Sequence, residues 1–408
     1  MTAHAPRPPR HRARTVTLIV VGSVVALGAL GLGAVLTVGG VFVTPRYLEP
    51  WAADYHEQFD DPRMQVVAHA VLAPSGHNMQ PWIVELDPTD PDVLTLFVDA
   101  DRLTPAVDPF ARQTMVSQGT FLAYLEVAAA ELGFSTAIEL FPDGEYDETA
   151  LAASMTALPV ARITLSQDAA ASTDDYASLF LSDTNRAPYG PDALTADQIG
   201  ALTELADDAP DGLSLTMLTD QADLTALGDL ATVGTRIETE YAAATAESDA
   251  VFHATEQSKN DARSGFGVEG QGTSGFMKYL LQGLITIMPS INDDAAGAQR
   301  QIALTAAAVA NTPAYALITT ADNTRAEQVE AGILYGRFSL RARTLGLVMQ
   351  PLSQVIQEYP TMANPYAQVH AEYAPDGGTI QMLVRVGTPT TEYPVTMRRD
   401  AADLVRLG

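Results

Sequence analysis

Two stretches of the chain, 213 residues apart, repeat one pattern of apolar and small residues. The first runs from Arg112 to Gly133 (RQTMVSQGTFLAYLEVAAAELG) and the second from Arg325 to Gly346 (RAEQVEAGILYGRFSLRARTLG). Both have apolar residues at helical spacing and stop at a glycine, which predicts two equivalent amphipathic helices. Gly119 and Gly332 recur at one register although an interior glycine costs about 1 kcal/mol relative to alanine. We therefore expect close helix contact at these glycines, and we interpret the repeat as a duplicated domain.

Short apolar runs near these helices predict strands. Val93 to Val98 and Ala314 to Thr320 precede the two helices, and Val160 to Leu165 and Gln381 to Val386 follow them. A further helical stretch, Arg63 to Leu72, comes early in the first half. Helices and strands alternate loosely, so the pattern predicts an α+β fold rather than a regular βαβ array.

Composition shifts suggest where the body divides. We place a first lobe at residues 46–170 and a second at 171–408, joined in the Ser-, Ala-, Thr- and Asp-rich stretch Gln167 to Asp175. The second lobe carries an additional segment around residues 250–295, in which the irregular Gly265 to Gly275 precedes the apolar Phe276 to Met288. This segment is interpreted either as a lid-like insertion over a site or as a lipid-facing or partner-facing helix.

The N-terminal region has the pattern of a membrane anchor. Residues 15–45 carry no charge, and about 20 apolar residues suffice to span a bilayer. A cleavable secretory signal is the competing interpretation, although its apolar stretch is usually only about 7 to 15 residues. The basic tail at residues 1–14 contains Arg7, Arg10, Arg12 and Arg14, which predicts a cytoplasmic N-terminus and an extracytoplasmic body.

Charge and composition exclude several classes of function. The 408 residues carry a net charge of −27, and the four arginines of residues 1–14 all precede the first acidic residue, Glu49, so the rest of the chain is still more acidic. Such a surface repels polyphosphate, so we expect no nucleic-acid binding. The absence of cysteine excludes disulfides and thiolate sites, and the seven scattered histidines predict no metal site.

One short run carries most of the chemical information. Ala73 to Trp82 reads APSGHNMQPW, in which Pro74, Ser75 and Gly76 predict a tight turn with exposed backbone donors. By composition alone this is a polar helix-to-strand turn. Its His77 could contact a substrate or cap the turn. The later run from Gly265 to Gly270 satisfies G-x-G-x-x-G, but the polar residues before it favour a flexible loop.

The order of these ten residues resembles a known family. Pro-Ser-x-x-Asn-x-Gln-Pro-Trp is similar to the flavin-contacting signature of the nitroreductase superfamily, and the whole run resembles its Acg-like branch, in which two nitroreductase halves are fused. The likeness extends loosely from about residue 62 to the C-terminus. It implies a tandem nitroreductase-like α+β fold with two pseudo-symmetric lobes, which here would follow one transmembrane helix. It also implies one FMN per chain, held between the lobes, and leaves a homodimer open.

The resemblance also implies which residues would contact FMN. Ser182-Asp-Thr-Asn-Arg186 is similar to the family's phosphate motif, with Ser182 in place of its first arginine. Basic residues near the C-terminus would close over the phosphate, and the turn after the second repeat helix would face the flavin ring. The implied cofactor-binding residues are Pro74, Ser75, Gly76, Asn78, Gln80, Thr184, Arg186, Pro351, Leu352, Ser353, Gln354, Arg398 and Arg399.

The function implied is that of an FMN-dependent NAD(P)H oxidoreductase anchored in the membrane. Hydride would pass through flavin N5 to a nitroaromatic or quinone-like acceptor, with NAD(P)H as a transient reductant, and no catalytic side chain is assigned. Two alternatives stay open: a protein that sequesters flavin without turnover, and a membrane interaction module that has lost the cofactor.

Overall fold

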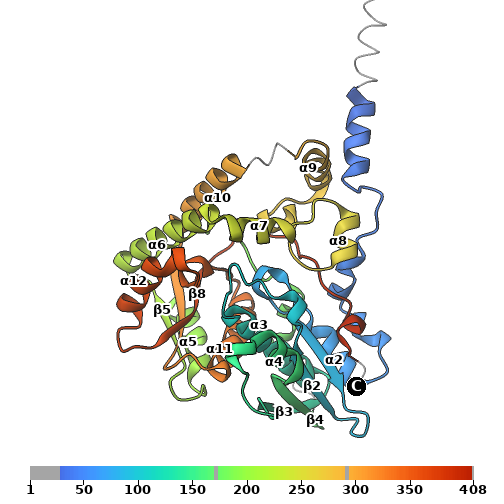
Figure 1. Ribbon diagram of the computed structural model, residues 1–408, viewed down its shortest axis with the longest axis vertical. Helices are drawn as coiled ribbons and strands as arrows, with labels where there is room; N and C mark the ends of the chain where they lie inside the picture. The colour runs from blue at the N-terminus through green and yellow to red at the C-terminus, as the bar shows by residue number, and fades with distance from the viewer. Residues whose placement is uncertain (1–27, 170–172, 290–293, 407–408) are drawn as a thin grey trace, which may run out of the picture.

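The fold consists of two lobes, each built around a four-stranded antiparallel sheet (Figure 1). The computed structural model describes residues 28–169, 173–289 and 294–406. The strand orders, β1-β2-β4-β3 and β5-β6-β8-β7, are the same in the two lobes. This α+β architecture with two equivalent sheets agrees with the fold class expected from the sequence.

The elements of the first lobe are α2 (Pro62–Ala70), β1 (Trp82–Leu86), β2 (Val93–Val98), α3 (Arg112–Glu131), β3 (Phe134–Leu140), α4 (Leu151–Ala157) and β4 (Ala161–Gln167). Those of the second are α5 (Ala196–Thr203), β5 (Ser214–Leu218), α6 (Gln221–Glu240), α7 (Ala242–Ala250), α8 (Glu256–Ala262), α9 (Gly275–Ile287), α10 (Asp294–Val309), β6 (Ala314–Thr320), α11 (Arg325–Thr344), β7 (Val348–Pro351), α12 (Ala363–Tyr373) and β8 (Thr379–Gly387). Helices α6 to α10 all lie between β5 and β6, where the first lobe has only the short link between β1 and β2.

The predicted repeat helices are confirmed as α3 and α11. Each is followed by a glycine in the left-handed region, Gly133 with φ 83° and Gly346 with φ 74°. This conformation is the usual end of a helix, and glycine adopts it without steric cost. The predicted strands are confirmed as β2, β4, β6 and β8, with shifts of one or two residues at some ends.

The two repeat helices cross at the two glycines that recur in the sequence. A Cβ atom on Gly119 would lie 2.0 Å from the carbonyl oxygen of Val329, and one on Gly332 would lie 2.1 Å from that of Val116. Both obstacles are backbone atoms of the facing helix. Only hydrogen fits at these positions, and the close approach expected there is confirmed.

The first arginine of each repeat helix reaches into the opposite lobe. Arg112, which is 1% exposed, donates from Nη1 to the carbonyl oxygen of Gln381 (2.8 Å) and from Nη2 to that of Ile356 (2.7 Å). Arg325 donates from Nη1 to the carbonyl oxygen of Phe110 (2.7 Å) and forms an ion pair with Glu148. The duplicated arginines therefore fasten the lobes to each other in both directions.

The C-terminal segment also crosses between the lobes. After β8 the chain runs back to the first lobe, where Arg398 N donates to Tyr47 O (3.0 Å) and Arg406 N donates to Val84 O (2.9 Å). Near it, Trp51 Nε1 donates to Thr396 O (2.8 Å). We call residues 396–399 of this segment the C-terminal strap.

The N-terminal segment projects from the body as a helix (Figure 1). Residues 28–38 are helical, and the helix ends where Gly40 takes φ 92°. Among the described residues, no helix combines the length and the apolar content that crossing a membrane requires. Residues 15–27 of the predicted span at 15–45 lie outside the described part, as does the tail at 1–14.

The helix crossing gives a stability prediction. Gly119→Ala places a methyl group against backbone that cannot rotate away, so we expect a loss of about 1–3 kcal/mol, measured as a lower urea midpoint. Gly200→Ala in α5 is the matched control, because its added Cβ would meet nothing within 4 Å. It should gain up to about 1 kcal/mol from helix propensity. Equal behaviour of the two variants would contradict the crossing.

Candidate functional site

The turn at residues 74–80 has an unusual backbone. His77, Asn78 and Gln80 have φ values of 50°, 52° and 52°. Residues other than glycine rarely adopt this region, and each such residue costs on the order of 1–3 kcal/mol. Three of them within four positions mean that the surrounding structure holds the turn in place.

Hydroxyl groups of α3 hold the near side of the turn. Ser117 Oγ accepts from Gly76 N (3.1 Å), and Thr120 Oγ1 donates to Pro74 O (2.6 Å). Within the turn, Ser75 Oγ accepts from Gln80 N (3.0 Å). The turn is thus docked on the helix that forms the lobe crossing.

The amide side chains of the turn bind other parts of the chain. Asn78 Nδ2 donates to the carbonyl oxygens of Gly265 (2.9 Å) and Met397 (3.0 Å). Gln80, which is fully buried, donates to Arg263 O (2.9 Å), and its Oε1 accepts from Arg399 N (2.7 Å). In addition, Gly265 N donates to Asn78 O (3.0 Å). We call the junction of residues 74–80, 183–186, 263–270 and the C-terminal strap the inter-lobe seam.

Both predicted C-terminal arginines are buried among protein acceptors. Arg398 donates to Asn78 Oδ1 (2.9 Å), Leu72 O (2.9 Å) and Asp183 Oδ2 (3.0 Å), and its guanidinium lies 4.6 Å from the ring centre of Trp51. Burial lowers its pKa, which the Asp183 carboxylate opposes.

Arg399 occupies the other side of the turn. It donates to Gln80 O (2.9 Å), Trp82 O (3.0 Å) and Asp99 Oδ2 (3.2 Å). Burial, followed by the charge of Arg102, lowers its pKa to about 10. Both guanidinium groups are turned inward rather than towards the surface.

Arg186 is different, since most of its donors are unused. Nη1 donates to Gly270 O (2.8 Å), and within the described part of the chain no other hydrogen bond of this guanidinium is found. Burial lowers its pKa, and Asp183 opposes that shift. Thr184 is half-buried beside it. Of the three predicted arginines, Arg186 alone could offer a bidentate contact to an anion without losing several protein contacts.

The predicted segment Pro351 to Gln354 lies against α6 instead of the turn. Leu352 N donates to Leu383 O (2.8 Å), and a Cβ on Gly234 of α6 would lie 3.1 Å from Gln354 Cβ. Among the described residues, no hydrogen bond joins this segment to residues 74–80. It approaches the seam only through β7, where Met349 O accepts from Asn185 N (2.9 Å).

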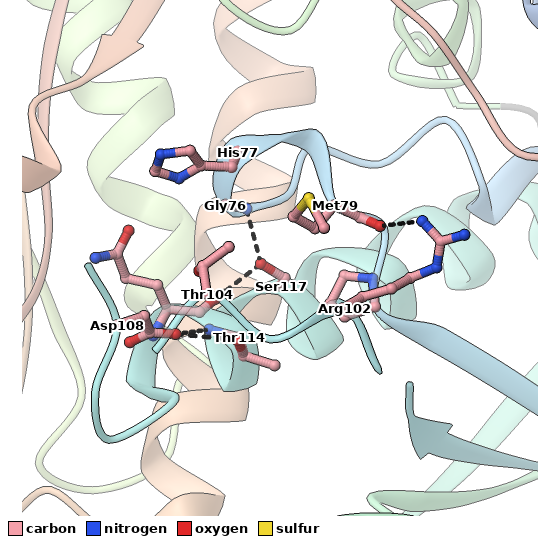
Figure 2. A pocket seen from close by; sticks show the side chains of 10 residues that line it. Gly76, His77, Met79, Arg102, Thr104, Asp108, Thr114 and Ser117 are labelled. Atoms are coloured by element: carbon pink, nitrogen blue, oxygen red, sulfur yellow. Dashed lines mark hydrogen bonds between the residues drawn. The ribbon is translucent and has the colours of Figure 1, made fainter. Parts of the chain in front are cut away.

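The free space beside the turn is small. A cavity of about 10 Å³ lies between the turn and the start of α3, lined by Gly76, His77, Asp108 and Ser117 among others (Figure 2). That volume holds about one water molecule, whereas pockets for ligands of FMN's size occupy about 300–1,000 Å³. In this arrangement the seam does not fit FMN, because residues 263–270 cover Asn78.

A larger hollow lies away from the turn. It has about 370 Å³ and lies between residues 43–49 and α8, lined by Arg46, Glu49, Asp261 and Arg263 among others. Its lining residues carry both signs of charge and include no aromatic ring on which a flavin could stack. We therefore do not place the flavin site in this hollow.

His77 sits where the turn meets α7 and the segment that follows α8. Its Nε2 lies 3.3 Å from Ser248 Oγ, and its ring centre lies 6.0 Å from that of Phe266. Burial, followed by the positive charge of Arg186, lowers the pKa of His77 to about 4. The imidazole is therefore neutral at pH 7.

Asp183 and Ser117 were not singled out in the sequence. Asp183 forms an ion pair with Arg398. The sequence signal that could have revealed this role is an acidic residue inside a segment that resembles a phosphate motif. Ser117 belongs to the repeat helix, where nothing distinguishes it from other small residues. Its role appears only when the turn is docked on α3.

Comparison with known proteins places part of the chain in a family. A segment of 78 residues is 40% identical to a "Putative NAD(P)H nitroreductase" of Mycobacterium tuberculosis, and 76 residues are 40% identical to the "Putative NAD(P)H nitroreductase acg" of the same species. These segments cover 19% and 18% of this chain and 22% of each relative, so the chain spans about a fifth of the length of the curated relatives it matches. No family model matches. This part of the chain is distantly homologous to Acg-type proteins that are named as nitroreductases, as the sequence resemblance implied.

Two solved structures show a loose likeness. A nitroreductase with bound FMN from Desulfitobacterium hafniense is 11% identical with a TM-score of 0.34, covering 56% of this chain and 96% of that one. The nitroreductase NfnB from Mycobacterium smegmatis, in complex with NADPH, is 16% identical with a TM-score of 0.31, covering 55% and 93%. Scores this low do not establish a common arrangement of the whole chain.

The Arg398 contacts give a second prediction. Arg398→Gln leaves the partly buried Asp183 beside a neutral side chain, and breaking a buried ion pair costs about 3–5 kcal/mol, an upper limit here. Arg337→Gln, which removes an exposed ion pair with Glu126, should change the free energy of unfolding by less than about 1 kcal/mol. Denaturant midpoints measure both. A small effect of Arg398→Gln would show that the strap is not held as described.

The lowered pKa of His77 gives a third prediction. The unfolded chain takes up a proton near pH 6.5 and the folded chain only near pH 4, so this contribution to stability is complete above pH 6.5 and lost as the pH falls towards 4. His77→Asn removes the titrating imidazole and should reduce that loss by at most about 3 kcal/mol. Asparagine is the replacement because it tolerates the left-handed backbone. Unfolding midpoints between pH 4 and 7 measure the difference. Parallel profiles for the two proteins would contradict the assignment.

Proposed function

We propose that the chain is an FMN-dependent oxidoreductase of the nitroreductase type, with one FMN between its lobes and residues 263–270 acting as a lid. The observation that supports it best is the turn at 74–80, which combines the flavin signature with three strained residues other than glycine. Backbone strain of this kind is concentrated at functional sites. The partial homology to proteins named as NAD(P)H nitroreductases supports the same class.

Residues 263–270 must leave the turn before flavin enters. Three of the groups that hold this segment, Asn78, Gln80 and Arg186, also match the flavin signature and the phosphate motif. Lys259 holds it as well, through Glu269. Each hydrogen bond lost contributes about 0.5–1.5 kcal/mol net. The binding free energy of a ligand can therefore offset the loss of these hydrogen bonds. After opening, Asn78 and Gln80 would face the ring system and Arg186 the phosphate.

Bound FMN would supply the redox chemistry, and the chain would supply orientation and charge. NAD(P)H is the proposed transient donor, and a nitroaromatic or quinone-like molecule the acceptor. Backbone amides and the Asn78 amide would stabilise negative charge on the ring. We also propose that residues 15–45 form the membrane anchor, with residues 1–14 in the cytoplasm and lobes at 46–170 and 171–408 on the opposite side.

A second candidate is a module that has kept the fold and lost the cofactor. The closed seam favours it, because Arg398 already donates to Asp183 and Asn78. The cavity beside the turn holds only about one water molecule. A flavin-sequestering protein without turnover is the third alternative. It shares the lid with the first.

Flavin content separates these candidates. The full chain in detergent is incubated with FMN and desalted, and its absorbance is recorded before and after anaerobic addition of NADPH. Stoichiometric flavin that bleaches supports the oxidoreductase. Flavin that binds but does not bleach supports sequestration, and failure to retain any flavin in a folded sample supports the cofactor-free module.

Arg186 gives a fourth prediction. Arg186→Ala removes the spare guanidinium and should weaken FMN binding roughly tenfold or more, since a hydrogen bond to a charged group contributes about 1.5–3 kcal/mol. Arg337→Ala is the control, because that exposed arginine pairs with Glu126. Titration of the apo chain with FMN, followed by flavin fluorescence, measures both. Equal affinity in the two variants would place the phosphate elsewhere.

A further inference from the structure

Helix α9 is oriented opposite to an amphipathic helix of a water-soluble protein. Its polar residues Lys278 and Gln282 are buried, at 9% and 0% exposure, whereas Phe276 and Ile287 are 54% and 50% exposed. Met277 is also exposed, at 56%. A surface helix normally buries its apolar stripe and exposes its polar one. The outward face of α9 therefore suits an apolar medium better than water.

A buried ionic cluster fixes α9 in this orientation. Lys278 Nζ lies 3.0 Å from Glu256 Oε1, and Lys259 Nζ donates to the same oxygen (2.6 Å) and to Gln282 Oε1 (2.6 Å). Lys259 also pairs with Glu269. These are the only lysines in the chain. Rotating α9 to hide its apolar face would break this cluster, so the exposed face is built in.

The projecting helix at residues 28–38 meets α9 at close range. A Cβ on Gly283 would lie 2.0 Å from Val35 O, and one on Gly39 would lie 2.0 Å from Tyr279 O. Gln282 Nε2 donates to Gly39 O (2.6 Å). The two helices stand together at one end of the molecule in Figure 1. We call the exposed face of α9 together with residues 28–42 the apolar end.

We propose that the apolar end lies in a lipid bilayer, with α9 in the interfacial layer and residues 28–38 entering the hydrocarbon. Leu30 is 71% and Phe42 84% exposed, and residues 28–34 are exposed on every side, so a lipid phase covers them where one docked protein surface would not. The sequence that leads into this helix, residues 15–27, carries no charge. An interfacial helix buries its apolar face at the boundary between headgroups and acyl chains. The proposal does not depend on flavin binding.

Because the chain contains no cysteine, each position can be labelled singly. The full-length variants Phe276→Cys and Ile287→Cys carry an environment-sensitive fluorophore in vesicles of phosphatidylcholine and phosphatidylglycerol. Their controls are Phe110→Cys and Leu181→Cys, whose native side chains are equally exposed at 56% and 49%. Leu30→Cys reports on the projecting helix. All five replace exposed side chains, and circular dichroism checks their fold.

The expected result is a blue shift of emission at positions 276, 287 and 30, and loss of that emission when the lipids carry nitroxides on their acyl chains. Emission at 110 and 181 should not change. Quenching at 30 without quenching at 276 and 287 would overturn the role of α9, and no quenching at any position would overturn the whole proposal. Nitroxide-independent shifts that grow with protein concentration would instead assign the apolar end to a second copy of the chain.

Discussion

The crossing of α3 and α11 at Gly119 and Gly332 is the contact on which the rest of the structure depends. It brings two backbones closer than any side chain permits, and Arg112 and Arg325 then extend the contact into the opposite lobes. The turn at 74–80 is docked on α3 through Ser117 and Thr120, so its position relative to the second lobe is set by the same crossing. A shift of α11 along α3 would therefore displace the turn from the segments that now cover it.

The polar groups of the seam explain how a flavin signature can occur in a closed junction. Amides and guanidinium groups that could bind a ring system and a phosphate can equally bind backbone carbonyl groups and a carboxylate. Here Asn78 and Gln80 bind Gly265 and Arg263, and Arg398 binds Asp183. Most buried polar groups are hydrogen-bonded, so an internal segment satisfies the turn where a ligand would otherwise do so. Residue identity alone does not decide between the two.

The sequence predicted the fold better than the site, and the reason is physical. Helices α3 and α11, their terminal glycines and the strands beside them follow from local periodicity and from a repeat at fixed spacing, which need no knowledge of distant contacts. The partners of Arg398 and Arg399 are more than two hundred residues away in several cases, so no local pattern reveals that these side chains point inward. Pro351 to Gln354 were assigned to the flavin by resemblance, but the insertion at α6 offers them another surface. The burial of Lys278 could not be predicted from the sequence either, because a lysine in an apolar helix normally faces water.

The lid and helix α9 are parts of one continuous segment. Glu269 lies within residues 263–270 and pairs with Lys259, which in turn binds Gln282 of α9. Moving residues 263–270 as a unit would pull Glu269 away from a buried cation, and breaking such a pair costs about 3–5 kcal/mol. The segment avoids this loss if it bends between Gly265 and Glu269, which leaves in place both the cluster and the single contact of Gly270 with Arg186. Gly267 lies in that interval, so the chain has a residue there with the backbone freedom that such a bend requires.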